Sequence, residues 1–409
     1  MARVAMTGAE WQSATAGVEL GTVSGALQID TTTKYGGSAS YEVSGAIGAG
    51  AAIEGELPAV SLATLYAKLH IYIDSMTSSP TEDIVCYWSF VTSGGVNIFS
   101  VQFYNDSGTL HMTGYINDFA TNVLNTTTDV AFDQWMRIEV HFDTSPADGS
   151  EVFTIRLNGS DVYSSSALTF TNKTVGLINF GGFNGSGGSD SGTVAYFDDI
   201  IVNNTSGSYN NSWVGDEKIV VAVPTGAGDN AATTGIYSYI NEIPPSNTAT
   251  SGSTMIELDT TTAIGDYNMT DSSTLGIDSY DSIKAISVMA RVREEAAGTS
   301  NYTLRIKSAS GGTVSASSSV DGGNATVRTN PSGTTAFGRM HISESDPTTG
   351  VAWTPTGTNS VDNMQVGAAT TDGNPDIWVL TLAAMIGYVD GSPPPAGNQP
   401  YRMMMGIGF

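Results

Sequence analysis

Cysteine is almost absent from this chain of 409 residues, because Cys86 is the only one. A single cysteine excludes a disulfide framework within the chain. It lies in the apolar run 84–90, so we expect a buried, small hydrophobic side chain. Long apolar runs are also missing, since none approaches the ~18 residues of a membrane-spanning helix. The first residues, MARVAMTGAEWQ, lack the apolar core of a signal peptide, so we expect no membrane insertion and synthesis in a cytoplasm.

Positive charge is scarce. The chain has 15 Lys and Arg against 40 Asp and Glu, a formal net charge of -25. Such a balance repels nucleic acid and anionic membranes, so we expect no nucleic-acid partner. Charged residues make up only 13% of the chain, and helical periodicity is nearly absent. An abundance of Gly, Ser, Thr and Asn instead favours a β-protein with many turns.

The chain divides around the stretch 195–230. Two strand-like apolar runs, 196–202 and 218–223, lie on either side of a segment rich in Asn, Ser and Gly. We interpret the first run as the closing strand of one domain and the second as the opening strand of another. The length also favours two domains. We therefore predict two antiparallel β-sandwiches in tandem, over 1–205 and 218–389, joined by a linker at 206–217.

Alternating patterns in the first half support this fold class. In WMRIEVHF, 135–142, Met136 and every second residue after it are apolar, while the other face carries mostly charged residues. This pattern is typical of a sheet with one buried side. The run VFTIRL that follows is closed by Asn158-Gly159, the dipeptide best suited to a tight type I′ hairpin turn.

Three segments carry a resemblance to a known family. QWMRIEVHFD, FTIRLNGSDVY and the later YFDDIIVNN resemble the concanavalin A-like, or laminin-G-like, jelly roll over about residues 1–205. Over about residues 130–370 the arrangement resembles structural proteins of tailed bacteriophages. There the second sandwich carries an IKAISVMARVR strand and a late DPTTGVAWT turn. The resemblance implies a virion protein that packs against copies of itself and other virion proteins.

The last residues, 390–409, have a different character. Pro393, Pro394 and Pro395 favour an extended arm. The arm ends in apolar side chains, which include Met403, Met404, Met405 and Phe409. Met-rich tips adapt to irregular grooves. We expect this arm either to dock on a neighbouring subunit in an oligomer or to pack back on its own domain.

No set of residues forms a catalytic signature, so we expect a protein that is not an enzyme, with no catalytic or cofactor-binding residues. Glucanases of the concanavalin fold use closely spaced carboxylates on one strand. The nearest set here is Glu139, His141 and Asp143, which does not have that spacing. We interpret these three residues as the solvated face of an amphipathic strand.

Two weaker hypotheses concern ligands. Asp198 is a candidate calcium ligand, because hard oxygen ligands suit Ca²⁺, although capping a loop is the alternative role. Its neighbour Asp199 should point to the opposite face of the strand. Trp88, Tyr104 and Tyr115 lie in the meander that would form a concave sheet, and they are candidates for stacking on a glycan, unless they pack in the core.

Taken together, the sequence predicts a non-enzymatic virion protein. It would be tail-associated, as a fibre, baseplate or adaptor protein, with possible contact to a host-surface glycan. An alternative is a capsid decoration or head-fibre protein. An alternative from another class is a carbohydrate-active enzyme or a stand-alone lectin on the same fold.

Overall fold

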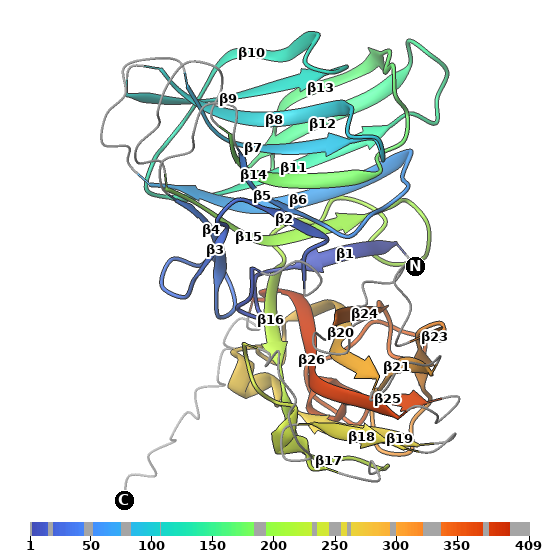
Figure 1. The fold of residues 1–409 in the computed structure, drawn as a ribbon. Helices are drawn as coiled ribbons and strands as arrows, with labels where there is room; N and C mark the ends of the chain where they lie inside the picture. The colour runs from blue at the N-terminus through green and yellow to red at the C-terminus, as the bar shows by residue number, and fades with distance from the viewer. Residues whose placement is uncertain are drawn as a thin grey trace, which may run out of the picture.

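The computed structural model describes residues 2–14, 19–44, 52–74, 83–106, 108–183, 194–230, 235–244, 255–259, 263–294, 300–321, 337–370 and 376–392. In these ranges nearly all of the regular secondary structure is β-strand, which confirms the predicted fold class (Figure 1). The helical segments described are short 3-10 turns: η1 (Tyr237–Tyr239), η2 (Ser272–Leu275) and η4 (Val361–Asn363). None of the helices in the described ranges is long and apolar enough to cross a bilayer.

The N-terminal sandwich consists of two antiparallel sheets. The eight-stranded sheet has the order β13-β12-β11-β6-β15-β4-β3, with β1 also paired to β15. Its strands are β1 (Arg3–Thr7), β3 (Gln28–Asp30), β4 (Ser40–Ser44), β6 (Thr64–Ile73), β11 (Trp135–Asp143), β12 (Glu151–Leu157), β13 (Ser160–Leu168) and β15 (Val194–Asn203).

The seven-stranded sheet packs against it and has the order β10-β9-β8-β7-β14-β5-β2. Its strands are β2 (Thr22–Ser24), β5 (Ala52–Glu56), β7 (Asp83–Val91), β8 (Asn97–Asp106), β9 (Thr109–Ile116), β10 (Thr121–Val130) and β14 (Leu177–Phe183). In both sheets, neighbours in space are often distant in sequence, as in β14 between β7 and β5. This crossing of connections is consistent with a jelly-roll type of sandwich.

Alternating apolar residues of the two sheets form one core between them. On β11, Met136, Ile138, Val140 and Phe142 are buried, as the sequence pattern predicts. Cys86 is buried in the same core, which confirms its expected role as a small hydrophobe. The predicted hairpin turn is also confirmed: Asn158 and Gly159 have φ of 51° and 85°, and they join β12 to β13.

The C-terminal sandwich again has two sheets, one of five strands around β26 and one of six strands around β25. The first sheet contains β16 (Lys218–Ala222), β18 (Ile256–Leu258), β20 (Ser282–Glu294), β24 (Phe337–Ser343) and β26 (Ile377–Val389). The second sheet contains β17 (Pro224–Ala227), β19 (Ile264–Met269), β21 (Asn301–Lys307), β22 (Ser315–Ala316), β23 (Val320–Asp321) and β25 (Gln365–Thr370). Their facing apolar side chains form a separate core.

A third apolar cluster joins the two sandwiches. It combines Met6, Trp11 and Ile201 of the first sandwich with Met289 and Met385 of the second. Beside it, the guanidinium of Arg3 donates two hydrogen bonds of 2.7 Å to the carboxylate of Glu217. A junction that is both apolar and paired by buried charges holds the two sandwiches in one arrangement.

The predicted linker is not a free tether. The strands of the first sandwich end with β15 at Asn203, and those of the second begin with β16 at Lys218. Between them, Trp213 lies against the outer face of the eight-stranded sheet, where the guanidinium carbon of Arg156 is 3.6 Å from the centre of its ring. The C-terminal arm residues Pro393, Pro394, Pro395, Met403, Met404, Met405 and Phe409 lie outside the described residues.

Candidate functional site

A groove with a volume of about 560 Å³ lies on the outer face of the seven-stranded sheet. Its size falls in the ~300–1,000 Å³ range of ligand sites. Three aromatic side chains line it: Tyr87 of β7, Tyr115 of β9 and Phe119 of the turn after β9. Phe119 is 48% exposed. An apolar ring held out in water at the edge of a groove is a feature of binding sites.

The floor of the groove follows from the pleat of the strands. Residues alternate between the two faces, so Tyr87 and Ser89 point outward while Trp88 between them enters the core. The register places Tyr87 opposite Gln102 of β8, and Ser89 opposite Ser100. Ser100 is in turn opposite Tyr115. The groove therefore has rows of hydroxyl and amide groups bordered by aromatic rings.

Several polar atoms on this face have no partner within the protein. The Oδ1 of Asn97, the Oγ of Ser100 and the Oδ1 of Asn179 are buried and accept no hydrogen bond from the described protein groups. Asn97 is 4% exposed and Ser100 is fully buried. Asn179 of β14 is in register with Ser89. Of these residues, only Asn97 lines the groove. Since buried polar atoms nearly always have a partner, its Oδ1 is suited to a ligand that donates a hydrogen bond.

The turn at the edge of the groove is strained. Asn117, Asp118 and Phe119 have φ of 56°, 55° and 63°, three consecutive residues in the left-handed region. Asn and Asp tolerate this conformation, but for Phe it costs on the order of 1–2 kcal/mol. The turn is fixed by hydrogen bonds from the Asn117 and Asp118 amides to the Ile98 and Asn97 carbonyls, both 2.9 Å. Strain that the surrounding structure maintains is common at ligand sites.

The same turn is anchored at a second point. The Nδ2 of Asn117 donates to the Thr169 carbonyl over 2.9 Å, and the Thr171 amide donates to Oδ1 of Asn117 over 2.8 Å. The ring of Phe119 meets that of Tyr115 edge-on, with centroids 6.0 Å apart. These contacts hold the two rings of the groove edge in a fixed relation before any ligand is present.

Tyr87 also belongs to a hydrogen-bonded pair. Its hydroxyl donates to the carboxylate of Glu54 on β5. Burial, together with the negative charge of Glu54, raises the pKa of Tyr87 well above its ordinary value. The hydroxyl therefore stays protonated at neutral pH and holds Glu54 beside the groove.

The three side chains predicted to bind a glycan lie in three different environments. Tyr115 lines the groove. Tyr104 is on the outward-facing side of β8, where its ring lies 5.1 Å from that of His111. Trp88 is 1% exposed and packs against Phe90 in the core, so it does not reach the groove. Phe119, Asn97 and Gln102 were not predicted; an Asn-Asp pair just after a strand was the available signal of the turn that carries Phe119.

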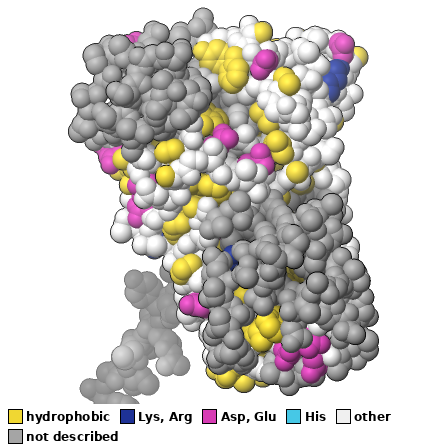
Figure 2. Space-filling view, in the orientation of Figure 1, with side chains coloured by type: hydrophobic (Ala, Val, Ile, Leu, Met, Phe, Trp, Pro, Cys, Tyr) yellow, Lys and Arg dark blue, Asp and Glu magenta, His cyan; other side chains and the backbone are white. Residues whose placement is uncertain are grey.

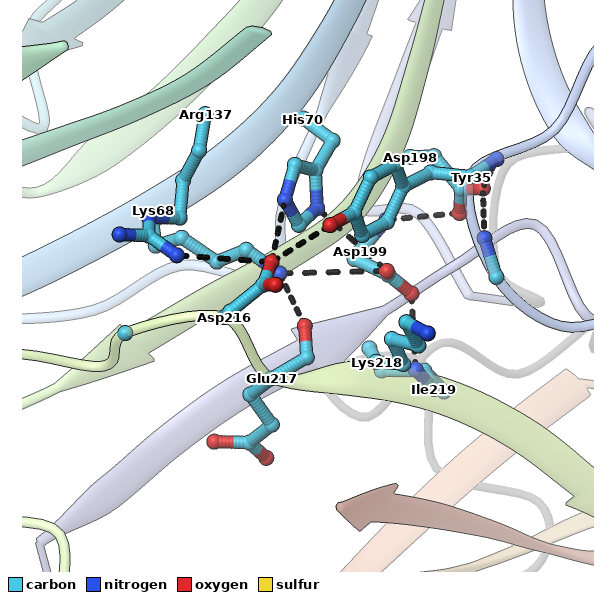
Figure 3. Close-up of polar contacts among 12 residues, drawn as sticks. Tyr35, Lys68, His70, Arg137, Asp198, Asp199, Asp216, Glu217, Lys218 and Ile219 are labelled. Atoms are coloured by element: carbon cyan, nitrogen blue, oxygen red, sulfur yellow. Dashed lines mark hydrogen bonds and ion pairs between the residues drawn. The ribbon is translucent and has the colours of Figure 1, made fainter. Parts of the chain in front are cut away.

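A second polar site lies between the sandwiches. A close-up shows Tyr35, His70 and Asp216 in contact (Figure 3). The Tyr35 ring stacks on His70 at 3.5 Å, and its hydroxyl donates to Asp216 over 2.6 Å. Arg137 lies 3.4 Å from the same carboxylate oxygen. These residues, with Trp135 and Asn158, line a small cavity of about 190 Å³.

The charges of this junction largely neutralise one another. The two nitrogens of His70 lie 3.4 Å from Asp199 and 3.3 Å from Asp216. Lys68 donates to the Glu217 carbonyl and lies 3.9 Å from Asp199. Burial lowers the pKa of His70, and the charge of Lys68 lowers it further. Hydrogen bonding to His70 lowers the pKa of Asp216. We interpret this site as a joint between the sandwiches.

Asp198 and Asp199 do not point to opposite faces, so that expectation was wrong. A bulge between Asp198 and Ile201 interrupts the pairing of β15 with β6, and Asp199 has φ of 47°. Both carboxylates consequently approach Gly8. Asp198 accepts hydrogen bonds from the amides of Tyr35 at 2.8 Å and Gly36 at 3.2 Å. Burial raises the pKa of Asp198 well above its ordinary value.

These contacts bear on the calcium hypothesis. The amides aimed at Asp198 occupy lone pairs that a cation would need, which fits the alternative role of capping a loop. Among the described residues, no group of three or more His, Cys, Asp or Glu side chains is arranged to hold a metal ion. The calcium role of Asp198 stays a prediction.

The expected solvated face on β11 was also wrong in part. Glu139 is 1% exposed, because its carboxylate accepts a hydrogen bond of 2.8 Å from the Gly215 amide of the linker. His141 stacks on Tyr66 at 4.1 Å, and Trp213 covers both rings. Asp143 caps its own loop through the Ser145 amide. The linker packs across this face, and sequence alternation alone does not reveal such a cover.

The fold and the groove define a jelly-roll β-sandwich protein with a ligand-sized groove on one sheet. No protein-family model and no curated protein matches the sequence. Solved structures do match, with probability 1.00. Several of them are β-sandwiches named as polysaccharide lyases or as a carbohydrate recognition domain, and nothing in the matches indicates a bacteriophage origin.

Three of these matching structures show how similar they are to this chain. An endo-β-1,4-glucuronan lyase from the fungus Trichoderma reesei is 10% identical with a TM-score of 0.34, covering 45% of this chain and 91% of its own. The alginate lyase vAL-1 from Chlorella virus is 11% identical with a TM-score of 0.32, covering 46% and 93%. Domain 4 of the arabinanase AbnA from Geobacillus stearothermophilus, in complex with arabinotriose, is 10% identical with a TM-score of 0.30, covering 50% and 92%.

The prediction that the protein is not an enzyme is contradicted by these matches, because polysaccharide lyases are among them. The prediction rested on the absence of one carboxylate motif. That absence excludes only one reaction, and a fold of this kind can carry several chemistries.

Proposed function

We propose that the N-terminal sandwich binds a glycan chain in the groove over β7, β8 and β9. The observation that carries the proposal is the combination of Phe119, held exposed by a strained turn, with the buried Oδ1 of Asn97 in the groove lining, which has no hydrogen-bond partner among the described residues. A sugar ring presents both matching surfaces: an apolar face for stacking and hydroxyl groups that donate hydrogen bonds.

The aromatic residues and the polar residues of the groove would make different contacts with a sugar. Tyr115 and Phe119 give edges on which a sugar ring can stack. Gln102, Asn97 and Ser89 lie on the floor between the rings. Amide and hydroxyl side chains both donate and accept, so they can follow the alternating donors and acceptors of a sugar.

The test is binding to an array of polysaccharides, followed by titration calorimetry with the oligosaccharides that bind. We expect Phe119→Ala and Tyr115→Ala each to weaken binding by ~10-fold or more, about 1.4 kcal/mol. Tyr280→Ala is the matched control, since Tyr280 is 40% exposed but belongs to the second sandwich. Retention of full affinity in both groove variants would contradict the proposal.

A second candidate is cleavage of the bound glycan. It rests on the hydrogen bond between Tyr87 and Glu54, which places a proton donor and a carboxylate together beside Gln102. A reducing-end assay over the glycans that bind would detect either hydrolysis or elimination. We expect Tyr87→Phe to keep binding and lose turnover, whereas turnover that survives this change would exclude the pair.

The particle setting stays a prediction. A tail-associated role in a bacteriophage, or the alternative place on the capsid, is compatible with contact to a host glycan and rests on the sequence resemblance alone. Immunogold electron microscopy of phage particles, with an antibody to the recombinant chain, would test it. Gold at the tail or head would place the protein, and unlabelled particles with an accessible epitope would remove this setting.

A further inference from the structure

Cationic residues are absent from one sheet of the N-terminal sandwich. The seven strands of the groove sheet, as the structure describes them, contain no Lys or Arg and five acidic residues: Glu54, Glu56, Asp83, Asp106 and Asp129. The opposite sheet carries Arg3, Lys68, Arg137 and Arg156. Among the described strands of this sandwich, Lys and Arg therefore occur only in the sheet without the groove.

The sequence extends this observation to the loops. Between Lys68 and Arg137 the chain has no Lys or Arg at all, and this stretch contains β7, β8, β9, β10 and every loop that joins them. Asp118 lies in the same stretch and lines the groove, where it is exposed. On the face of the molecule seen in Figure 2, acidic side chains are spread widely while Lys and Arg are sparse.

Cations near the sandwich ends are already paired. Lys173 forms ion pairs with Asp148 and with the buried Glu151 at 2.6 Å. Arg156 pairs with Asp161 at 2.5 Å and lies over the Trp213 ring. Neither lines the groove. A carboxylate on a ligand would thus meet Asp118, with Glu54 behind Tyr87, without a described cation to neutralise it.

We infer that the groove selects uncharged glycans and rejects polyuronates. Recognition of carboxylates in proteins relies on Arg and Lys, and the groove offers amides, hydroxyls and aromatic rings instead. The net charge of -25 adds repulsion at longer range. This inference rests on the proposed glycan-binding function and names the class of glycan that the same site would take.

The experiment compares probes that differ only at C6. Cellohexaose is paired with the matching β-1,4-glucuronan hexasaccharide, and mannohexaose with the matching β-1,4-mannuronan hexasaccharide; any further neutral glycan that binds on the array is paired with its uronate. Affinities are measured by titration calorimetry at low and high salt. We expect each neutral ligand that binds to have an affinity ~10-fold or more above that of its uronate at low salt. The ratio of the two affinities should be smaller at high salt.

Two variants connect the selectivity to the groove. Asp118→Asn keeps the left-handed turn and removes the charge, so it should lower the ratio of neutral to uronate affinity by strengthening uronate binding more than it changes neutral binding. Asp161→Asn, an exposed acid on β13 of the other sheet, is the matched control and should leave the ratio unchanged.

The outcomes separate the two proposals. Uronates that bind as tightly as their neutral partners would overturn the inference and leave the glycan site standing. Binding of a neutral ligand that persists in Phe119→Ala and Tyr115→Ala would move the site elsewhere and overturn both. Absence of binding to every neutral and acidic probe would also overturn both.

Discussion

The two sheets of the N-terminal sandwich carry opposite kinds of polar surface. The outer face of the eight-stranded sheet is rich in charge, and the linker covers part of it, so that Glu139 and Lys68 are buried and paired. The outer face of the seven-stranded sheet has no Lys or Arg in its strands, yet it holds a groove lined by Asn97, whose buried Oδ1 has no hydrogen-bond partner among the described residues. The comparison teaches that the densest charge in this molecule holds two domains together, while the face without Lys or Arg is the better candidate for binding.

The largest expected effect on stability concerns the buried ion pair of Arg3 and Glu217, beside the apolar cluster that joins the two sandwiches. Arg3→Ala should lower the free energy of unfolding by about 3–5 kcal/mol, because it leaves the buried carboxylate of Glu217 without its partner. Asp161→Ala is the control, since Asp161 is exposed and its pair with Arg156 should contribute no more than about 1 kcal/mol. Urea denaturation measures both. Equal losses of unfolding free energy in the two variants would contradict a special role of the Arg3–Glu217 pair.

The linker should contribute less than this ion pair to the free energy of unfolding. Trp213→Ala removes the ring that packs on Tyr66, His141 and Arg156, and we expect a loss of about 2 kcal/mol. Trp213→Phe keeps a ring there and should recover more than half of the loss. Glycan affinity should be the same in both, because the linker and the groove lie on opposite sheets. A parallel loss of affinity would show that the two faces are coupled.

In the groove, a substitution can relieve backbone strain and so raise stability. Phe119→Gly and Phe119→Ala both remove the exposed ring, but glycine adopts φ of 63° without strain. We therefore expect the Gly variant to be more stable than the Ala variant by about 1 kcal/mol, with equally weak glycan binding in both. Thermal denaturation gives the first comparison and calorimetry the second. A less stable Gly variant would argue against strain in this turn.

The smallest effect concerns pH. Burial holds the pKa of His70 below its ordinary value of about 6.5, so the unfolded chain takes up the proton first. Stability from this group is complete above about 6.5 and is lost as the pH falls below that value. Lys68, Asp199, Asp216, Tyr35 and Arg137 surround the ring.

His70→Gln should show a flatter decline of melting temperature across this range than the native chain. Glu10 and Asp198 have raised pKa values and change stability in the opposite direction, but they do so in both proteins and cancel in the comparison. Identical pH profiles would mean that His70 does not titrate differently on folding.

Local patterns predicted the strands well, because a strand's periodicity reflects one buried face. The alternation on β11 and the Asn158-Gly159 turn are examples, and both depend on neighbours in sequence. The cover over Glu139 depends on Gly215, and the burial of Trp88 depends on which face of β7 meets the other sheet. Contacts of this kind come from tertiary packing, which periodicity does not determine.

The groove was harder to predict for the same reason. Tyr115 was a candidate because it is aromatic and lies on a meander strand. Phe119 follows the strand in an irregular turn, and its exposure depends on the hydrogen bond that Asn117 donates to the Thr169 carbonyl and the one it accepts from the Thr171 amide. The bulge that turns Asp198 and Asp199 toward the same glycine has no sequence signature either.

The position of β1 has a consequence for the order of folding. Its Arg3 bonds to Asn203 of β15, 200 residues later, and the amide of Ala2 bonds to Glu344, 342 residues later. During synthesis, β1 therefore leaves the ribosome long before the strand it pairs with and the carboxylate that caps it. Such distant pairings close slowly. We expect the first sandwich to remain open at this edge until much of the second has been made, so that the joint is among the last parts of the protein to form.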